Sequence, residues 1–332
     1  MKKAFTLIEL LMVIAIIAII SSLAVTKVGG LKESSARKVS LANQSAVERA
    51  LNSYLISGGW LNRLESLIYA GEGGAPIVSS AAPGDFDFDT VCTAEGREGF
   101  YMGPSADAAA TAQLRSDRNS GLTPGLRNVL CLYSLSKAEA TSLTSRLGLQ
   151  HVMAHTAYAD MGEYEYPSLH YPRDRAWGDG TVPNGSDGLN PNASAIVATL
   201  VTNTMTVAAV NPMTDLGRTI YQAMGQELMN TKNWGESYDE AEVRAEVKAK
   251  GGVLLAFGLG DNCSAIGKSN AGLENAPYAT YAQRQFYSRY IVLIRMRTVG
   301  AGSVSAVLPE FAGVIDCCGN TIRAAEHIIR SM

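Results

Sequence analysis

The segment Phe5–Val25 is the most apolar part of this chain. Its few polar residues are Thr6, Glu9, Ser21 and Ser22. A helix of about 20 residues rises about 1.5 Å per residue and therefore spans the roughly 30 Å hydrocarbon core of a bilayer. The pattern predicts a membrane-inserted helix. Because Lys2 and Lys3 precede it and no basic residue interrupts it, the positive-inside rule keeps the N-terminus in the cytoplasm and exports the rest of the chain.

Three interpretations fit this segment: a secretory signal peptide, a single-pass anchor and an assembly helix. Ser22-Leu23-Ala24 is a small-x-small site at which a signal peptidase could cut. However, the apolar run exceeds the about 7 to 15 residues of a secretory signal, which does not usually carry an acid near its start. Glu9 favours the assembly helix, because a carboxylate at the edge of hydrocarbon costs a few kcal/mol on insertion scales and is normally explained by a partner.

The N-terminal residues resemble a known export signal. Lys2-Lys3-Ala4-Phe5-Thr6-Leu7-Ile8-Glu9-Leu10 combines a basic leader, a small residue, Phe, an acid and the start of the long apolar run. This order resembles the class III signal of type IV pilins and type II secretion pseudopilins. Ala4 stands where the family usually has Gly. The resemblance covers only the N-terminal helix, up to about Leu55.

The resemblance implies how these residues are used. A prepilin peptidase would cut between Ala4 and Phe5 on the cytoplasmic side and N-methylate the new Phe5 amine. Glu9 would then pair with the N-terminal amine of a neighbouring subunit. This pairing is physically reasonable, because a buried ion is tolerated only when matched and loss of one partner costs about 3 to 5 kcal/mol.

A second, amphipathic helix is predicted over Leu31–Ser57, after Gly29-Gly30 and before Gly58-Gly59. The glycine pair at its start costs about 2 kcal/mol relative to alanine and predicts a kink. One buried stripe is predicted from Val39, Ala42, Ala46, Val47, Ala50, Leu51, Tyr54 and Leu55. Charged residues occupy the other faces: Lys32, Glu33, Arg37, Lys38, Glu48 and Arg49. An unbroken helix over Thr6–Ser57 would be about 75 Å long.

The remainder of the chain predicts mixed helices and strands. A capping box at Ser136 and Glu139 predicts a helix with Leu143 and Leu147 on one face. Other helices are expected over 60–69, 216–228, 236–250 and 321–332, and strands over 149–154, 195–201, 205–210, 253–259, 290–297 and 304–308, with a hairpin through Asn203. Residues 162–192 predict a long surface loop. The expected fold class is α+β, with the long N-terminal helix packed on a mainly antiparallel sheet.

Composition narrows the class of protein. The 332 residues are 47% hydrophobic and 18% charged, which indicates a globular chain. The net charge is −3, or −5 once Lys2 and Lys3 are removed, so no basic surface for nucleic acid is expected. We expect a leader over residues 1–4, an assembly helix over 5–57 with a transmembrane part over 5–25, and an exported head over 58–332.

The five cysteines are candidates for disulfides, because all follow the membrane segment and would be exported. They are Cys92, Cys131, Cys263, Cys317 and Cys318. An odd number leaves at least one unpaired within the chain, and the adjacent Cys317 and Cys318 would be strained as a pair. No zinc spacing occurs. One or two structural disulfides or buried thiols are expected, with a redox role for the adjacent pair as the alternative.

Acidic and histidine clusters offer weak metal candidates. Asp85, Asp87 and Asp89 alternate as D-F-D-F-D, like the start of a calcium loop, but Gly96 stands where an EF-hand needs Glu. A second acidic cluster contains Asp174, Asp179, Asp187, Asn190 and Asn192. Some pseudopilins hold calcium in their heads, which the resemblance makes relevant. Solvated turns explain both clusters more simply, so no cofactor is expected and calcium is the alternative.

Two further sequence patterns could indicate a metal site or a phosphate-binding loop. His151 and His155 are four residues apart, which on a helix would align two metal ligands, although the local sequence also fits a strand. Residues 258–262, GLGDN, lack the Lys and Ser of a phosphate loop and predict a turn. No nucleophile elbow is present. We therefore expect no enzyme.

The predicted function is structural: a subunit of a type IV pilus or a type II secretion pseudopilus. Its expected partners are other pilin-like subunits, the prepilin peptidase, and an inner-membrane assembly platform with its ATPase. The expected location is the bacterial inner membrane, with an exported head, and a filament after assembly. The alternative is a membrane-anchored binding module that does not polymerise. A head of this size favours a minor or specialised subunit.

Overall fold

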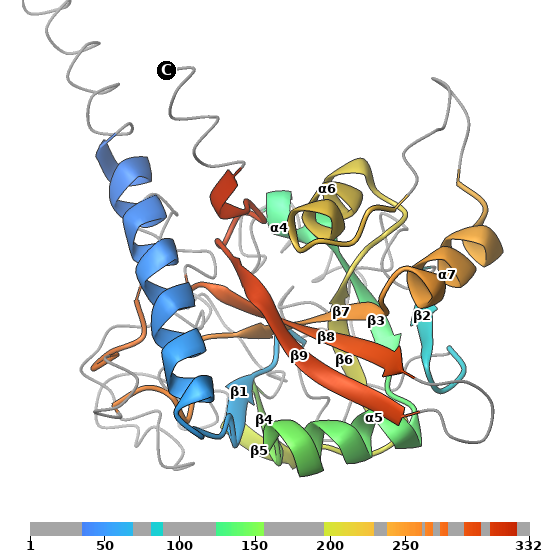
Figure 1. Cartoon of the computed structure of the whole chain (residues 1–332), viewed down its shortest axis with the longest axis horizontal. Helices are drawn as coiled ribbons and strands as arrows, with labels where there is room; N and C mark the ends of the chain where they lie inside the picture. The colour runs from blue at the N-terminus through green and yellow to red at the C-terminus, as the bar shows by residue number, and fades with distance from the viewer. Residues whose placement is uncertain are drawn as a thin grey trace, which may run out of the picture.

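The computed structural model describes residues 35–68, 81–88, 124–155, 196–228, 238–260, 263–267, 273–277, 289–299 and 306–323. These residues form an α+β fold in which helices surround a mixed, mostly antiparallel sheet (Figure 1). This confirms the predicted fold class for the described part of the chain. The predicted transmembrane helix lies outside the described residues.

The described elements follow one another along the chain as a long helix, then strands interspersed with short helices. The first helix covers residues 35–56. The strands are β1 (Arg63–Glu65), β2 (Asp85–Asp87), β3 (Leu130–Ser134), β4 (His151–His155), β5 (Ile196–Leu200), β6 (Thr206–Val210), β7 (Val253–Gly258), β8 (Ile291–Val299) and β9 (Ala306–Ile315). The shorter helices are α4 (Pro124–Val129), α5 (Lys137–Ser142), the π-helical turn η3 (Leu143–Leu147), α6 (Asp215–Ala223) and α7 (Glu240–Ala249).

The nine described strands join in one sheet that branches at β7. One path runs β2-β3-β6-β7-β1-β4-β5, and β8 pairs with β7 and then with β9. Among these strands only β1 and β4 are parallel. The pairing of β7 with β1 rests on a single residue pair, Glu65 with Gly258, whereas β7 and β8 share six. The strongest part of the sheet is therefore β7, β8 and β9.

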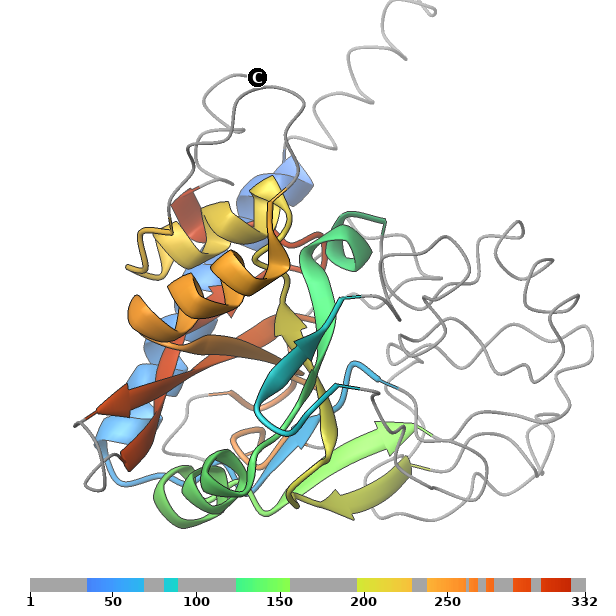
Figure 2. The same cartoon turned by 90° about the vertical axis from the view of Figure 1, so that its right-hand side faces the viewer.

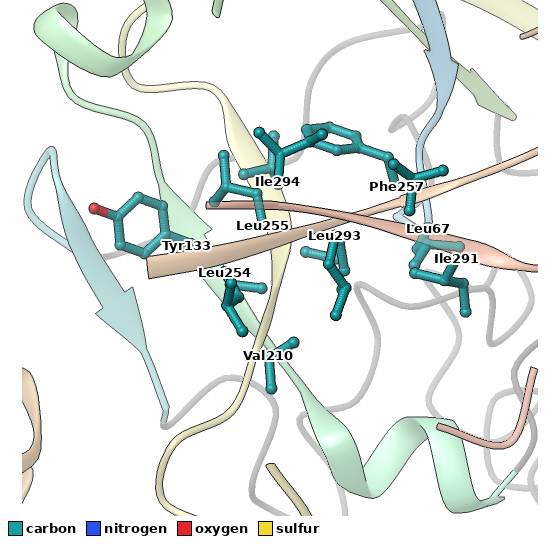
Figure 3. Close-up of a cluster of buried hydrophobic side chains, with 14 of the residues drawn as sticks. Leu67, Tyr133, Val210, Leu254, Leu255, Phe257, Ile291, Leu293 and Ile294 are labelled. Atoms are coloured by element: carbon teal, nitrogen blue, oxygen red, sulfur yellow. The ribbon is translucent and has the colours of Figure 1, made fainter. Parts of the chain in front are cut away.

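The core lies on both faces of β7 and β8. Every residue of β7 is buried, and Leu254 and Leu255 are both 0% exposed although they point to opposite faces. Leu293 and Ile294 of β8 are likewise 0% exposed. Figure 3 shows these side chains grouped with others from β3 and β6. A continuous apolar run of this kind is typical of a strand covered on both sides.

The predicted capping box is confirmed at the start of α5. The Glu139 amide donates to Ser136 Oγ at 3.3 Å, and the Ser136 amide donates to Glu139 Oε2 at 2.8 Å. Leu143 and Leu147 are both buried on the continuation of this helix, as expected. The local rules of helix initiation were sufficient at this site.

Two sequence predictions are wrong. Residues 60–69, expected as a helix, contain the strand β1, which pairs with β4 and β7. The stretches around Asn203 are strands, as predicted, but they do not form a hairpin: β5 pairs with β4, and β6 pairs with β3 and β7. In both regions long-range pairing decided the outcome, and local propensity does not report such pairing.

Strand β9 lies at one edge of the described sheet, because β8 is its only partner strand. Side chains from other elements cover parts of its outer edge. Ser142 of α5 donates its hydroxyl to Val307 O at 2.5 Å, and Gln44 donates to Val314 O at 2.9 Å. Pro309, inside the strand, has no N–H to offer. These are recognised ways of protecting a sheet edge.

Candidate functional site

Helix 35–56 docks on the head through one face, which Figure 1 shows beside β8 and β9. Its buried side chains recur every three or four residues and are Ser40, Gln44, Val47, Leu51 and Tyr54. That spacing places them on one side of the helix. The first two are polar and the last three are largely apolar, so the docking surface has two chemically different halves.

The polar half begins with Ser40 and Tyr290. The Tyr290 hydroxyl donates to the Ser40 carbonyl oxygen at 2.7 Å, and the two hydroxyl oxygens are 3.1 Å apart. Burial raises the pKa of the Tyr290 phenol well above its usual value, so the hydroxyl stays protonated and remains a donor. This contact joins the start of the described helix to the residue that precedes β8.

Gln44 makes the next contact, one turn further along. Its Nε2 donates to Val314 O at 2.9 Å and to Asn320 O at 3.1 Å. Asn320 belongs to the turn after β9, in which Asp316 Oδ1 accepts hydrogen bonds from the amides of Cys318 and Asn320. One side chain therefore ties the helix to both the end of β9 and the turn that follows.

Glu48 completes the polar half. Burial raises the pKa of its carboxyl group, and the nearby Val314 backbone offsets part of that rise. The backbone at Gly313 lies close by: a Cβ there would be 3.6 Å from Glu48 Oε2.

The second half of the docking surface is apolar. Val47 is 1% exposed and Leu51 is 0% exposed, and both belong to the main hydrophobic core. Tyr54 packs into the same core and donates its hydroxyl to Trp60 O at 3.2 Å. Burial of large apolar side chains contributes about 1.5 to 3 kcal/mol each. This half supplies most of the hydrophobic stabilisation between helix and head.

The predicted buried stripe is therefore partly wrong. Val39, Ala42 and Ala46 are exposed, whereas Ser40, Gln44 and the half-buried Glu48 face the head. Counting apolar residues missed these positions, because the head binds them by hydrogen bonds rather than by apolar contact. The signal was available in the spacing: Ser40 and Gln44 extend the positions of Val47, Leu51 and Tyr54 backwards at helical intervals.

The predicted processing and assembly residues Ala4, Phe5 and Glu9 lie outside the described residues, as does the second acidic cluster between Asp174 and Asn192. No helix of the described residues is long and apolar enough to span a bilayer. Helix 35–56 is the part of the predicted assembly helix that the structure does describe.

The predicted calcium candidates Asp85 and Asp87 lie on strand β2. The alternation instead creates an aromatic face: Phe86 and Phe88 stack with ring centroids 5.2 Å apart, and Phe86 meets Tyr133 edge-on at 5.1 Å. Asp85 pairs with Arg244 of α7 at 3.1 Å. Asp89 lies outside the described residues. Within the described ranges, no three His, Cys, Asp or Glu side chains are grouped to hold a metal ion.

The paired histidines lie on strand β4 rather than on a helix. At about 3.3 Å per residue, positions four apart on a strand are about 13 Å apart, too far to share one metal ion. Of the GLGDN sequence, Gly258 ends β7, and Gly260 lies so close to Glu65 that a Cβ would come within 1.6 Å of Oε1. That glycine is explained by packing.

No two of the four described cysteines are joined in a disulfide, and Cys92 lies outside the described residues. Cys131, Cys263 and Cys317 are buried. Burial raises the pKa of the Cys263 thiol to about 12. The pKa of Cys317 is also raised, chiefly by its hydrogen bond with Cys318 and by burial. The thiols of Cys263 and Cys317 are therefore protonated at neutral pH and are poor nucleophiles.

Comparison with known proteins bears on the N-terminus alone. Residues 1–25 match the family model of the prokaryotic N-terminal methylation motif. The chain carries the hallmark of the type IV pilin and pseudopilin family. No curated protein and no solved structure matches the chain. The methylation motif implies a membrane-anchored precursor that is processed for export, of a family that is structural rather than enzymatic.

Proposed function

We propose that this chain is a structural subunit of a type IV pilus or a type II secretion pseudopilus. The observation that carries the proposal is the methylation motif over residues 1–25, followed in the same chain by a helix docked on an α+β head. The leader is residues 1–4, the assembly helix is residues 5–57 with its transmembrane part over 5–25, and the exported head is residues 58–332. The chain has no catalytic role and needs no cofactor.

The docked half of the helix gives the assembly helix a mechanical connection to the head. Ser40 and Gln44 form hydrogen bonds with Tyr290, Val314 and Asn320, and Val47, Leu51 and Tyr54 enter the core. A force applied to the N-terminal part of the helix therefore reaches β8 and β9 directly. That connection is what a filament subunit requires, because its head must follow its helix.

Glu9 drives the assembly step in this proposal. A prepilin peptidase removes residues 1–4 and methylates the Phe5 amine, which keeps its charge. The Glu9 carboxylate then pairs with the Phe5 amine of a neighbour as the helices leave the bilayer. An inner-membrane platform and its ATPase supply the work. Before assembly the subunit sits in the inner membrane with its N-terminus in the cytoplasm and its head exported.

The test combines mass spectrometry of the mature N-terminus with a Glu9→Ala variant. We expect the native chain to begin at methylated Phe5 and the variant to be processed but absent from filaments, because an unpaired buried amine costs about 3 to 5 kcal/mol. Glu33→Ala is the matched control, since it removes an acid outside the apolar run. It should assemble normally.

Four outcomes would contradict the proposal. A chain that still begins at Met1 would show that no prepilin peptidase acts on it. A chain that begins at Val25 would show that a signal peptidase removes residues 1–24 instead. Filaments that form equally well with Glu9→Ala would remove the pairing. A processed chain that is never found in a filament would favour a membrane-anchored binding module.

A further inference from the structure

The two adjacent cysteines lie in the turn that follows β9. Cys317 is 0% exposed and belongs to the main hydrophobic core, whereas Cys318 is partly exposed and packs against that core. Their side chains contact each other through a hydrogen bond between the two thiol groups. The structure therefore places one accessible thiol directly against one buried thiol.

The turn that holds this pair is closely hydrogen-bonded. Asp316 Oδ1 accepts hydrogen bonds from the amides of Cys318 at 2.8 Å and Asn320 at 2.9 Å. The Gly319 amide donates to Asp316 O at 3.0 Å. The Cys318 carbonyl oxygen packs on α4, where a Cβ at Gly125 would lie 2.7 Å from it. A change in the backbone at Cys318 therefore disturbs every one of these contacts.

The same turn is part of the docking surface of helix 35–56. Asn320 O accepts hydrogen bonds from Gln44 Nε2 at 3.1 Å and from the Asp316 amide at 3.0 Å. One carbonyl oxygen thus closes the turn and also holds the helix to it. Figures 1 and 2 both show the last described residues, in red, at the end of the head where this helix begins. A movement of the turn would weaken the polar half of the docking surface.

We propose that Cys317 and Cys318 are a site of reversible oxidation, at which a disulfide between the two adjacent sulfurs loosens the contact of the turn with helix 35–56. This inference rests on the proposed function for its oxidant, because an exported head enters a compartment in which disulfides form. The oxidant is itself a disulfide, carried by a small thiol compound or by a thiol oxidase.

The reaction consists of two thiol–disulfide exchanges. Cys318 Sγ, the accessible thiol, loses its proton and attacks one sulfur of the donor disulfide, which forms a mixed disulfide and releases one donor thiolate. Cys317 Sγ then loses its proton and attacks Cys318 Sγ, which forms the bond between the two cysteines and releases the second donor thiolate. Both protons end on the donor thiols. The cysteine pair loses two electrons, and the donor disulfide gains them.

This disulfide would deform the turn. Consecutive Cα atoms are about 3.8 Å apart across a trans peptide bond, whereas a disulfide normally joins Cα atoms about 4.4 to 6.8 Å apart. The backbone at the pair must therefore shift, and the hydrogen bond from the Cys318 amide to Asp316 shifts with it. Strained disulfides are also more easily reduced than relaxed ones. The strain thus explains both the effect on the turn and the reversibility of the oxidation.

The test equilibrates the purified full-length protein in detergent with glutathione disulfide. Acid quenching, alkylation of the remaining thiols under denaturing conditions and tryptic mass spectrometry follow. The tryptic peptide of residues 298–323 contains Cys317 and Cys318 and no other cysteine. We expect most of this peptide to lose two hydrogen atoms and to carry no alkyl group, and excess reduced glutathione to restore both thiols. The buried Cys131 and Cys263 should stay alkylatable and are the internal controls.

Hydrogen exchange of the reduced and oxidised forms provides the second arm. Oxidation should raise the exchange rates of amides in the first half of helix 35–56 several-fold. Helix α7 lies across the head from that helix, where its Arg244 pairs with Asp85, and its exchange should not change (Figure 1). Cys318→Ser is the matched variant, because it keeps Cys317 and a side chain of similar shape. Glutathione disulfide should alter neither its peptide nor its exchange.

The outcomes that overturn this inference differ from those of the filament test. Two unmodified thiols, a glutathione adduct on Cys318 that Cys317 does not displace, or a disulfide from either residue to another cysteine would overturn the site. A disulfide between the pair that leaves the exchange of helix 35–56 unchanged would overturn its effect on the helix, as would the same change in Cys318→Ser. Each of these results would leave the proposed function standing, because none depends on N-terminal processing or on filaments.

Discussion

Gln44 Nε2 lies 2.9 Å from the carbonyl oxygen of Val314, a residue 270 positions later in the chain. This hydrogen bond joins the first described helix to the last strand of the sheet. Because Gln44 also donates to Asn320, a single side chain holds the edge strand and its following turn against the helix. These two hydrogen bonds hold the first described helix against the edge of the sheet.

Gln44→Ala should therefore destabilise the protein. Val314 O and Asn320 O would each lose a donor, and a buried polar group left unsatisfied costs about 1 to 3 kcal/mol. The measurement is the denaturant midpoint of the full-length protein in detergent. Asn52→Ala, at an exposed position of the same helix, is the control. Equal midpoints for the two variants would contradict the role given to Gln44.

Leu51→Ala should cost more than Gln44→Ala. The side chain is 0% exposed and belongs to the main core, and truncation of such a leucine costs about 2 to 5 kcal/mol. Ser53→Ala, exposed two residues later, should change the free energy of unfolding by less than about 0.5 kcal/mol. A small effect at Leu51 would mean that the helix is not docked as the structure describes.

The pH dependence of stability should contain a contribution from Glu48. Burial raises its pKa in the folded state above the unfolded value of 4.5, so the folded protein binds more protons between these two pKa values. Stability should therefore fall as the pH rises through this window, and it should recover as the pH falls. Glu48→Gln should remove this dependence. The test measures the denaturant midpoints of both proteins between about pH 4 and pH 7, a range that begins near the usual carboxylate pKa.

Two glycines with positive φ should respond differently to substitution. Gly225→Ala should cost about 1 to 2 kcal/mol, because φ is +82° but a Cβ meets nothing within 4 Å. Gly252→Ala should cost more, because φ is +98° and a Cβ would lie 1.8 Å from Met296 O, which is backbone and cannot move aside. The thermal midpoints of the two variants should be measured together. Equal midpoints would contradict this order.

The cysteines should differ in their reactivity toward iodoacetamide. At pH 8 a thiol of pKa about 12 is ionised to about one part in ten thousand, so Cys263 should remain unlabelled in the folded protein. Cys318, which is partly exposed, should be labelled before the buried Cys131 and Cys317. Peptide mapping before and after denaturation measures this. Rapid labelling of Cys263 in the native protein would contradict its burial.

The sequence was most informative where the controlling interactions were local. The capping box at Ser136 and Glu139, and the uninterrupted apolar run of β7, each depend on a few neighbouring residues and were predicted correctly. The methylation motif is likewise a contiguous signal. Such features need no knowledge of the fold.

The partners of each element were not predictable in the same way. Strand β1 is only three residues long, and its pairing with β4 and β7 is what makes it a strand. The polar docking residues Ser40 and Gln44 are explained by Tyr290, Val314 and Asn320, about 250 to 280 residues later. A single sequence contains the two sides of each contact but not their pairing.

The alternation of Asp and Phe at residues 85–88 shows how one pattern admits two meanings. Carboxylates at every second position suggest a cation loop, but the same spacing lets Phe86 of β2 stack with Phe88, which follows the strand. The interleaved aromatic residues were the better indicator, because burying them against Tyr133 stabilises the strand.

The covered edge of β9 has a consequence for a protein that works at high local concentration. Subunits crowded in a membrane or along a fibre bring sheet edges together repeatedly, and an open edge would let strands of different molecules add to one another. Here Ser142 and Gln44 occupy the carbonyl oxygens of Val307 and Val314, and Pro309 has no N–H, so these three positions of β9 are less able to pair with another strand. In the proposed filament, the helix that packs against neighbouring subunits would therefore also protect part of the sheet edge from them.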